Sequence, residues 1–302
     1  MADFDPSGPH EVVYEDVEYA SVGDASLVAR VYRPRAGSGP WPALVDVHGG
    51  AWCYFDRTVD AYIDTALAAC GMVVVALDFR QGESGRYPRA VADVVAGIRW
   101  TRANAARLAA RVDPLGAIGG STGGHLAMLA ALRPSAAEFA TTPVEGDEGV
   151  AARVAYVLPL WPILDPLARY RYLLARRAEP GASPDRLFQP QRLIEAHRVF
   201  FADEAEMSRA SVRRIVEERE FESLPPIWIA HPELDENVTL AMSEAFVAAY
   251  RSAGGAAELE VFPGVGHSFA NFGGEAADRA IERMRRFIAR QLELAADPRS
   301  AR

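Results

Sequence analysis

Hydrophobic residues in this chain recur in two different rhythms, and the two rhythms alternate along the sequence. Short apolar runs rich in β-branched residues predict strands buried on both faces, and the clearest of them is 72–77 (MVVVAL). Between such runs, apolar residues recur at helical spacing, as at Val91, Val94, Val95 and Ile98. This alternation predicts an α/β protein with a mostly parallel sheet and helices on both of its faces.

The predicted elements can be given as residue ranges. Strands are expected at 27–32, 43–47, 72–77, 115–118, 154–160, 227–230 and 259–262. Helices are expected at 63–70, 88–104, 125–132, 240–252 and 275–294.

The segment 161–223 interrupts this rhythm. It is rich in Arg and Glu and carries large apolar residues at helical spacing, such as Tyr170 and Leu173. We therefore expect a helical cap inserted over the carboxyl ends of the strands, which is where open α/β sheets bind ligands. This interpretation divides the chain into a core at 1–160 and 224–302 and a cap at 161–223.

Composition excludes several classes of function. Half of the 302 residues are hydrophobic and the formal net charge is -9, which argues against binding to nucleic acid or to an anionic membrane. None of the 32 basic residues is a lysine, which excludes Schiff-base chemistry, pyridoxal phosphate attachment, lysine-dependent phosphate-binding loops and protein kinases. Residues 1–15 lack an apolar signal core and no apolar run has membrane-spanning length, so we expect a cytoplasmic protein.

Cysteine and histidine usage gives no indication of a metal or a disulfide framework. Cys53 and Cys70 are too few for either, and the six histidines show no zinc-ligand spacing. We therefore expect no metal and no cofactor.

The stretch 119–124 (GGSTGG) lies between a predicted strand and a predicted helix, with Ser121 in a Gly-x-Ser-x-Gly pattern. A sharp turn there would push the serine hydroxyl above the sheet, and Gly119 and Gly123 would keep the turn free of clashes. The following helix N-terminus would place free N–H groups beside developing negative charge. Taken alone, the pattern also fits a glycine-rich turn with an incidental serine.

A second segment, 48–52 (HGGAW), follows an earlier predicted strand and supports a nucleophilic role for the serine. The backbone N–H groups of Gly49, Gly50 and Ala51, together with that of Thr122, are expected to form an oxyanion hole.

The expected general base is His267, which lies in a glycine-flanked loop after a late strand. The other histidines, His48 among them, are expected to have structural roles. An acid should follow strand 227–230, and Asp235, Glu233 and Glu236 all lie there; local chemistry alone does not separate these three.

These motifs resemble the α/β-hydrolases, specifically the branch that includes hormone-sensitive lipase, acetyl esterases and kynurenine formamidases. The shared features are the HGG-A-W loop, the GGSTGGH turn, the order serine–acid–histidine, and the H-x-x-x-D-x-x-V and PGxGHSF segments. The resemblance covers about 31–291 and implies the α/β-hydrolase fold, with Ser121 as nucleophile, Asp235 as acid and His267 as base. It also implies hydrolysis of a small or medium carboxylic ester without a cofactor.

Two departures bear on the substrate. Gly120 stands where hormone-sensitive-lipase-like members usually carry Asp, and Ala51 and Trp52 stand where a third glycine is usual. Both changes move the chain toward the HGG-x-W type of formamidases and some feruloyl and carboxyl esterases. An amide or formamide hydrolase with the same triad is therefore the alternative, and a non-catalytic small-molecule receptor is a further reading that the intact triad disfavours.

The expected partner is a small-molecule ester, and a homo-oligomer is left open. Candidate walls of the substrate pocket are Trp52, Phe55, Tyr87 and Trp161. The predicted cap also holds a group of arginines that could bind an anionic substrate but that we expect to form a solvated face, namely Arg169, Arg171, Arg176 and Arg177.

Overall fold

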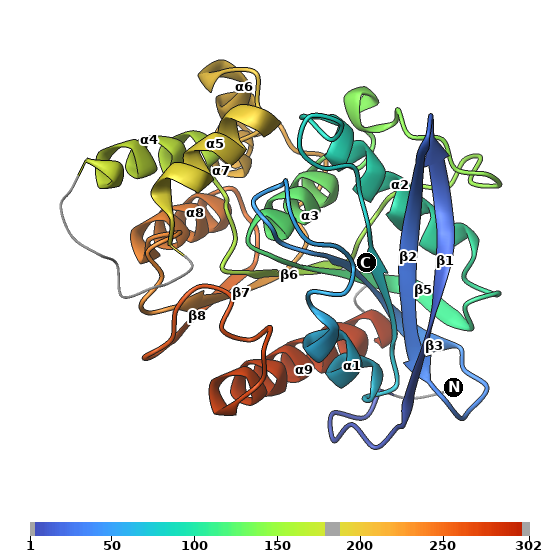
Figure 1. Ribbon diagram of the computed structural model, residues 1–302. Coiled ribbons are helices and arrows are strands. Elements are labelled where there is room, and N and C mark those ends of the chain that lie inside the picture. Colours follow the sequence, from blue (N-terminus) through green and yellow to red (C-terminus); the bar gives the residue numbers. More distant parts are fainter. Residues whose placement is uncertain (1–3, 179–187, 298–302) are drawn as a thin grey trace.

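An eight-stranded sheet runs through the computed structural model, in which residues 4–178 and 188–297 are described (Figure 1). The strands are β1 (Val12–Val22), β2 (Ala25–Pro34), β3 (Trp41–Val47), β4 (Val73–Leu77), β5 (Ala110–Gly120), β6 (Tyr156–Leu160), β7 (Ile227–Pro232) and β8 (Ala257–Phe262). Their order in the sheet is β1-β2-β4-β3-β5-β6-β7-β8. The pairs β1–β2 and β2–β4 are antiparallel, and every pair from β4 to β8 is parallel.

Helices cover both faces of this sheet. In chain order they are α1 (Ala61–Ala68), α2 (Arg89–Ala103), α3 (Thr122–Leu132), α4 (Pro166–Arg177), α5 (Pro190–Phe200), α6 (Glu204–Arg209), α7 (Val212–Glu217), α8 (Leu240–Ser252) and α9 (Glu275–Ala296), with a short 3₁₀ turn at Ala137–Phe139. The helices α1 and α9 lie on one face, and α2, α3 and α8 lie on the other (Figure 1). This arrangement is the α/β-hydrolase fold.

Alternating side chains of the central strands enter two separate apolar cores. Val45 of β3 and Val75 of β4 pack into the core that contains α2 and α3, whereas Leu44 and Val74 pack into the core that contains α1 and α9. Successive side chains of a strand point to opposite faces, so a strand covered on both sides must be apolar throughout. The continuous apolar runs that predicted these strands follow directly from this burial.

Four helices, α4 to α7, are inserted between β6 and β7 and fall within 161–223. We refer to them as the cap; that they form a separate unit stays a prediction. Helix α7 packs against α3 and α8, which brings the cap to the face of the sheet that carries α2 and α3.

The edge strand β1 was absent from the sequence prediction. Its Glu15, Asp16 and Glu18 are exposed, and Asp16 pairs with Arg30 of β2 at 2.8 Å. An edge strand with one open face carries charges that hide its β character from an apolar-run criterion. The strand predicted at 115–118 is also longer than expected, since β5 begins at Ala110.

Helix α9 spans 22 residues and is amphipathic, burying Ile281, Met284 and Ile288 against the sheet. Within residues 4–178 and 188–297, no helix combines the length and apolarity needed to cross a membrane.

Candidate active site

Ser121 occupies the turn between β5 and α3 and is held in a backbone conformation that side-chain-bearing residues seldom adopt. Its φ is 53° and its ψ is -116°. The turn is forced by close packing against β3: a Cβ on Gly123 would lie 1.8 Å from the carbonyl oxygen of Val47. The Ser121 N–H donates to the Leu160 carbonyl of β6 at 2.8 Å, which anchors the turn to the sheet.

Three side chains from three separate loops form one hydrogen-bonded series. His267 Nε2 lies 2.9 Å from Ser121 Oγ, and His267 Nδ1 lies 2.8 Å from Asp235 Oδ2. The other carboxylate oxygen of Asp235 accepts the N–H groups of Asn237 and Val238 at 2.7 and 2.9 Å. With Nδ1–H donating to the carboxylate, Nε2 is left as an acceptor for the serine proton. The structure thus brings together the three residues expected as nucleophile, base and acid.

Residues 233–238, here called the acid loop, also contain the two alternative acids. Glu233 accepts the N–H of Gly264 at 2.8 Å, and Glu236 forms an ion pair with Arg176 at 2.7 Å. The bond to His267 comes from Asp235, so the geometry favours Asp235 over both glutamates.

Residues 48–52, here called the oxyanion loop, bring their backbone close to Ser121, since a Cβ on Gly49 would lie 3.4 Å from the Ser121 Cβ. A Cβ on Gly50, whose φ is 125°, would lie 1.9 Å from the Tyr54 carbonyl oxygen, so this position requires glycine. Among the described residues, the N–H groups of Gly50 and Ala51 have no hydrogen-bond acceptor. Thr122 is the first residue of α3, and its N–H lies outside the helical hydrogen-bond ladder. These donors are available for a negative charge beside the serine.

His48 lies under this loop and is fully buried. Its Nδ1 bonds the Gly49 carbonyl at 2.6 Å, and its ring stacks on Phe79 at 4.4 Å. Burial lowers the pKa of His48, so its imidazole is neutral and holds the loop, in agreement with the role expected for it.

A cavity of about 190 Å³ opens beside Ser121. Two of the predicted wall residues, Phe55 and Trp161, line this cavity, and Phe55 is exposed at its mouth. Sequence reasoning did not single out a further set of lining residues, which includes Tyr54, Val59, Arg192, Leu193, Ser268, Asn271 and Phe272.

Two of the predicted wall residues, Trp52 and Tyr87, lie in the core instead of the cavity. Trp52 is 1% exposed, stacks on Phe200 at 5.1 Å and donates its indole N–H to His125 Nδ1 at 3.2 Å. Trp52 has a positive φ of 58°, and its side chain packs against His197 and Phe200 of the cap. Tyr87 is likewise buried and packs edge-on against Phe139.

The prediction of a solvated arginine face is wrong for Arg169. This residue is 1% exposed and lines the cavity, and its guanidinium bonds Asn237. The signal that could have revealed it is position, since Arg169 shares the buried side of α4 with Pro166, Tyr170 and Leu173.

The other cap arginines make contacts nearer the surface. Arg171 pairs with Glu204 at 2.8 Å, and both side chains are exposed. Arg177 bonds Gln191, and Arg176 reaches Glu236 of the acid loop.

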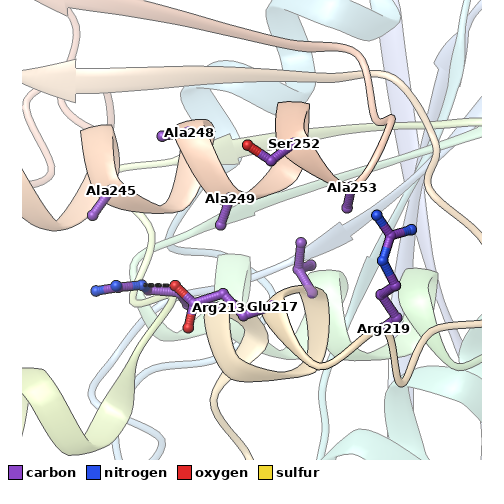
Figure 2. Close-up of a pocket in the computed structure, with 9 residues that line it drawn as sticks. Arg213, Glu217, Arg219, Ala245, Ala248, Ala249, Ser252 and Ala253 are labelled. Atoms are coloured by element: carbon purple, nitrogen blue, oxygen red, sulfur yellow. Dashed lines mark hydrogen bonds and ion pairs between the residues drawn. The ribbon is translucent and has the colours of Figure 1, made fainter.

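A second pocket lies between α7 and α8, away from the serine (Figure 2). Its wall on α8 consists of small residues, and on α7 Arg213 pairs with Glu217 at 2.7 Å. Within the described part of the chain, no cluster of His, Cys, Asp or Glu could hold a metal ion.

The fold and this constellation define the class of protein as an α/β-hydrolase with a serine–histidine–aspartate site. Residues 30–250 match the model of the BD-FAE family, and the chain therefore belongs to that family.

Named relatives agree with this assignment. The chain is 30% identical to Esterase LipC of Mycobacterium tuberculosis over 237 residues, which is 76% of this chain and 53% of that protein. It is 29% identical to Esterase LipQ of the same organism over 271 residues, or 87% of this chain and 59% of that protein. The chain thus spans little more than half the length of these curated relatives.

Solved structures show the same fold. The propionate-bound esterase Est2 of Thermogutta terrifontis superposes with a TM-score of 0.71 at 26% identity, covering 92% of this chain and 94% of that one. A structure of the same esterase phosphonylated by sarin superposes with a TM-score of 0.72 at 25% identity, covering the same shares of the two chains.

Proposed function

We propose that this protein hydrolyses carboxylic esters through an acyl-enzyme formed on Ser121. The observation that carries the proposal is the series Asp235–His267–Ser121, with donor–acceptor distances of 2.8 and 2.9 Å, beside backbone N–H groups that lack acceptors among the described residues. The relatives named esterases support the same reaction.

In the first half of the reaction, His267 Nε2 takes the proton of Ser121 as Oγ attacks the ester carbonyl. The carbonyl oxygen becomes an oxyanion that the N–H groups of Gly50, Ala51 and Thr122 stabilise, each donor contributing about 3 kcal/mol. Asp235 keeps the imidazole in the required tautomer and stabilises its protonated form. His267 then gives the proton to the leaving alcohol, and the acyl-enzyme remains.

In the second half, water attacks the acyl carbonyl while His267 takes one of its protons. The tetrahedral intermediate collapses, the proton returns to Ser121 Oγ, and the carboxylic acid leaves. Every proton moves through His267, so both half-reactions require the same imidazole geometry.

The size of the cavity supports a small acyl group. Its volume of about 190 Å³ is below the roughly 300 Å³ at which drug-sized ligand sites begin. We therefore propose that short acyl chains are turned over best. The cytoplasmic location remains a prediction, and the oligomeric state is open.

A panel of nitrophenyl esters from acetate to dodecanoate, with a matched anilide and a formanilide, tests the proposal. We expect the highest kcat/KM for acyl chains of a few carbons and much slower turnover of the anilide and the formanilide. Preferred turnover of either amide would overturn the ester assignment and support the amide-hydrolase alternative.

A further inference from the structure

One face of cap helix α4 contacts the acid loop through three side chains. The Arg169 Nε–H donates to the Asn237 carbonyl oxygen at 3.0 Å, and Nη2 donates to the side-chain oxygen of Asn237. The Tyr172 hydroxyl donates to the Glu236 carbonyl oxygen at 3.0 Å, and Arg176 pairs with the Glu236 carboxylate at 2.7 Å. Residues three and four apart share one helix face, so the contact is a property of α4 as a unit.

The first of these contacts continues without a break to the nucleophile. Arg169 holds Asn237, and the N–H of Asn237 donates to Asp235 Oδ1 at 2.7 Å. Asp235 Oδ2 bonds His267, which bonds Ser121. The position of the carboxylate therefore depends on a residue of the cap.

Arg169 also carries a charge that its hydrogen-bond partners do not neutralise. Both of its acceptors on Asn237 are neutral, and its Nη1 has no acceptor among the described residues. Burial lowers the pKa of Arg169 to about 10 and the negative charge of Asp235 opposes that fall, so the guanidinium stays protonated near neutral pH. A buried cation needs a buried anion, and Asp235 is the anion that interacts with it.

Other titratable groups also lie near Asp235. In the acid loop itself, Glu233 bonds the Gly264 N–H, and Glu236 pairs with Arg176 of α4. Burial lowers the pKa of His231 on β7, and burial raises the pKa of Tyr172 on α4. On the far side of Asp235, His267 must be neutral to accept the serine proton. Of the two α4 arginines that contact the acid loop, Arg176 pairs with the Glu236 carboxylate, and Arg169 interacts electrostatically with Asp235.

We propose that Arg169 is a positioning residue for the reaction. Through Asn237 it fixes the Asp235 carboxylate that orients His267, and it places a buried positive charge beside this pair. The inference rests on the proposed esterase activity and adds to it a function for the cap.

The variants Arg169→Met and Arg169→Lys separate charge from geometry. With nitrophenyl acetate, we expect Arg169→Met to lower kcat by about tenfold to a hundredfold, because a misplacement of about 1 Å in an active site costs this much. KM should change less than about threefold, because a small neutral ester needs no cation. Loss of the Arg169 positive charge favours the protonated form of the nearby imidazole. The acid limb of the pH profile of kcat/KM should therefore move up by about half a pH unit or more.

Arg169→Lys keeps the charge but presents an ammonium in place of the planar fork that bonds both oxygens of Asn237. We expect it to restore the acid limb and to recover only part of kcat. A loss that was merely structural would leave the pH profile of the folded fraction unchanged.

Two matched controls come from the same helix. Arg171→Met removes the exposed pair with Glu204 and should change neither kcat nor the pH profile. Arg176→Met removes the other arginine contact to the acid loop, at Glu236, and should lower kcat only slightly without moving the acid limb. Thermal unfolding of every variant reports whether the fold is retained.

The proposal is wrong if folded Arg169→Met keeps kcat within about twofold of wild type with an unmoved acid limb, or if Arg171→Met loses as much. Should Arg169→Met fail to fold, Asn237→Asp provides the test. That isosteric change adds a negative charge next to Asp235, and an unmoved acid limb would count against the proposal.

A second readout separates this inference from the proposed function. The rate at which a fluorophosphonate labels Ser121 reports the activation of the serine without ester turnover. If wild type is labelled but hydrolyses no ester, the proposed function fails, while slower labelling of Arg169→Met still supports the positioning role. Equal labelling rates for wild type and Arg169→Met would contradict the positioning role of Arg169.

Discussion

The two halves of the candidate site are held in place by different forces. Around Ser121, the turn and the oxyanion loop are fixed by backbone contacts so close that Gly50 and Gly123 admit no Cβ. Around Asp235, the acid loop is held by side chains of the cap, above all the Arg169 guanidinium. The comparison shows that steric exclusion sets the nucleophile, whereas charge and hydrogen bonds set its activating partners.

Removing the nucleophile should have the largest effect. We expect Ser121→Ala to lower kcat by roughly 10⁴ to 10⁶ while the backbone-built half keeps its shape, because only the attacking atom is lost. Turnover of nitrophenyl acetate measures the change, and an unaltered melting temperature confirms the fold. Near wild-type turnover would remove Ser121 from the mechanism.

Gly123→Ala probes the steric half directly. The new Cβ would lie 1.8 Å from the Val47 carbonyl oxygen, so β3 and α3 must separate, and we expect a loss of about 3 kcal/mol or more in unfolding free energy. Gly120→Ala is the matched control, since the nearest atom there is Trp161 Nε1 at 3.3 Å. Denaturant titration compares the two, and equal stabilities would show that the turn yields readily.

Three buried acids, Asp46, Asp60 and Asp64, allow the stability of the fold to be tested as a function of pH. Burial raises the pKa of Asp46 and Asp64 well above the ordinary value and that of Asp60 to about 7, although the Asn271 amide opposes the rise at Asp60. The folded state therefore retains protons that the unfolded chain releases. The stability that Asp60 contributes is present below about pH 4 and is lost as the pH rises through about 7.

Asp60→Asn removes one of these protonation equilibria. We expect the unfolding free energy of this variant to rise relative to that of wild type between about pH 4 and about pH 7, by up to about 1.4 kcal/mol per pH unit within that window. Melting temperatures across this range measure the gain. A constant difference between variant and wild type would show that Asp60 does not titrate there.

The smallest effect is expected at the pocket of Figure 2. Arg213→Ala breaks the helical pair with Glu217, which is partly exposed, and should change stability by no more than about 0.5 kcal/mol. Ester turnover should stay at the wild-type rate. A clear loss of kcat would show that the side of the cap near α8 also acts on the site.

The two halves of the site also differ in how well they can be predicted from the sequence. The half of the site around Ser121 depends on glycines and apolar runs that are visible in the sequence. Ser121, the loop 48–52 and strand β4 can therefore all be placed from local pattern. Trp52 is a predicted wall residue that the structure buries in the core under the cap, and neither its burial nor its positive φ can be read from residue type. The acid was selected among three carboxylates by resemblance, and the geometry favours the same one.

The half of the site around Asp235 is less predictable, and Arg169 is the example. An arginine within an Arg-rich helix suggests a solvated face, and its burial depends on the arrival of Asn237 from a loop 68 residues further along. The helical spacing of Arg169 with Tyr170 and Leu173 could have indicated a buried position, but its distant partner cannot be read from any local pattern.

Arg169 both lines the substrate cavity and bonds the acid loop. Selectivity and catalytic power therefore share a residue in this protein. A laboratory evolution campaign that remodels α4 to admit bulkier esters would alter proton transfer at the same time, and compensating mutations should accumulate in the acid loop. Libraries that vary α4 together with 236–238 are better suited to this scaffold than libraries confined to the cavity wall.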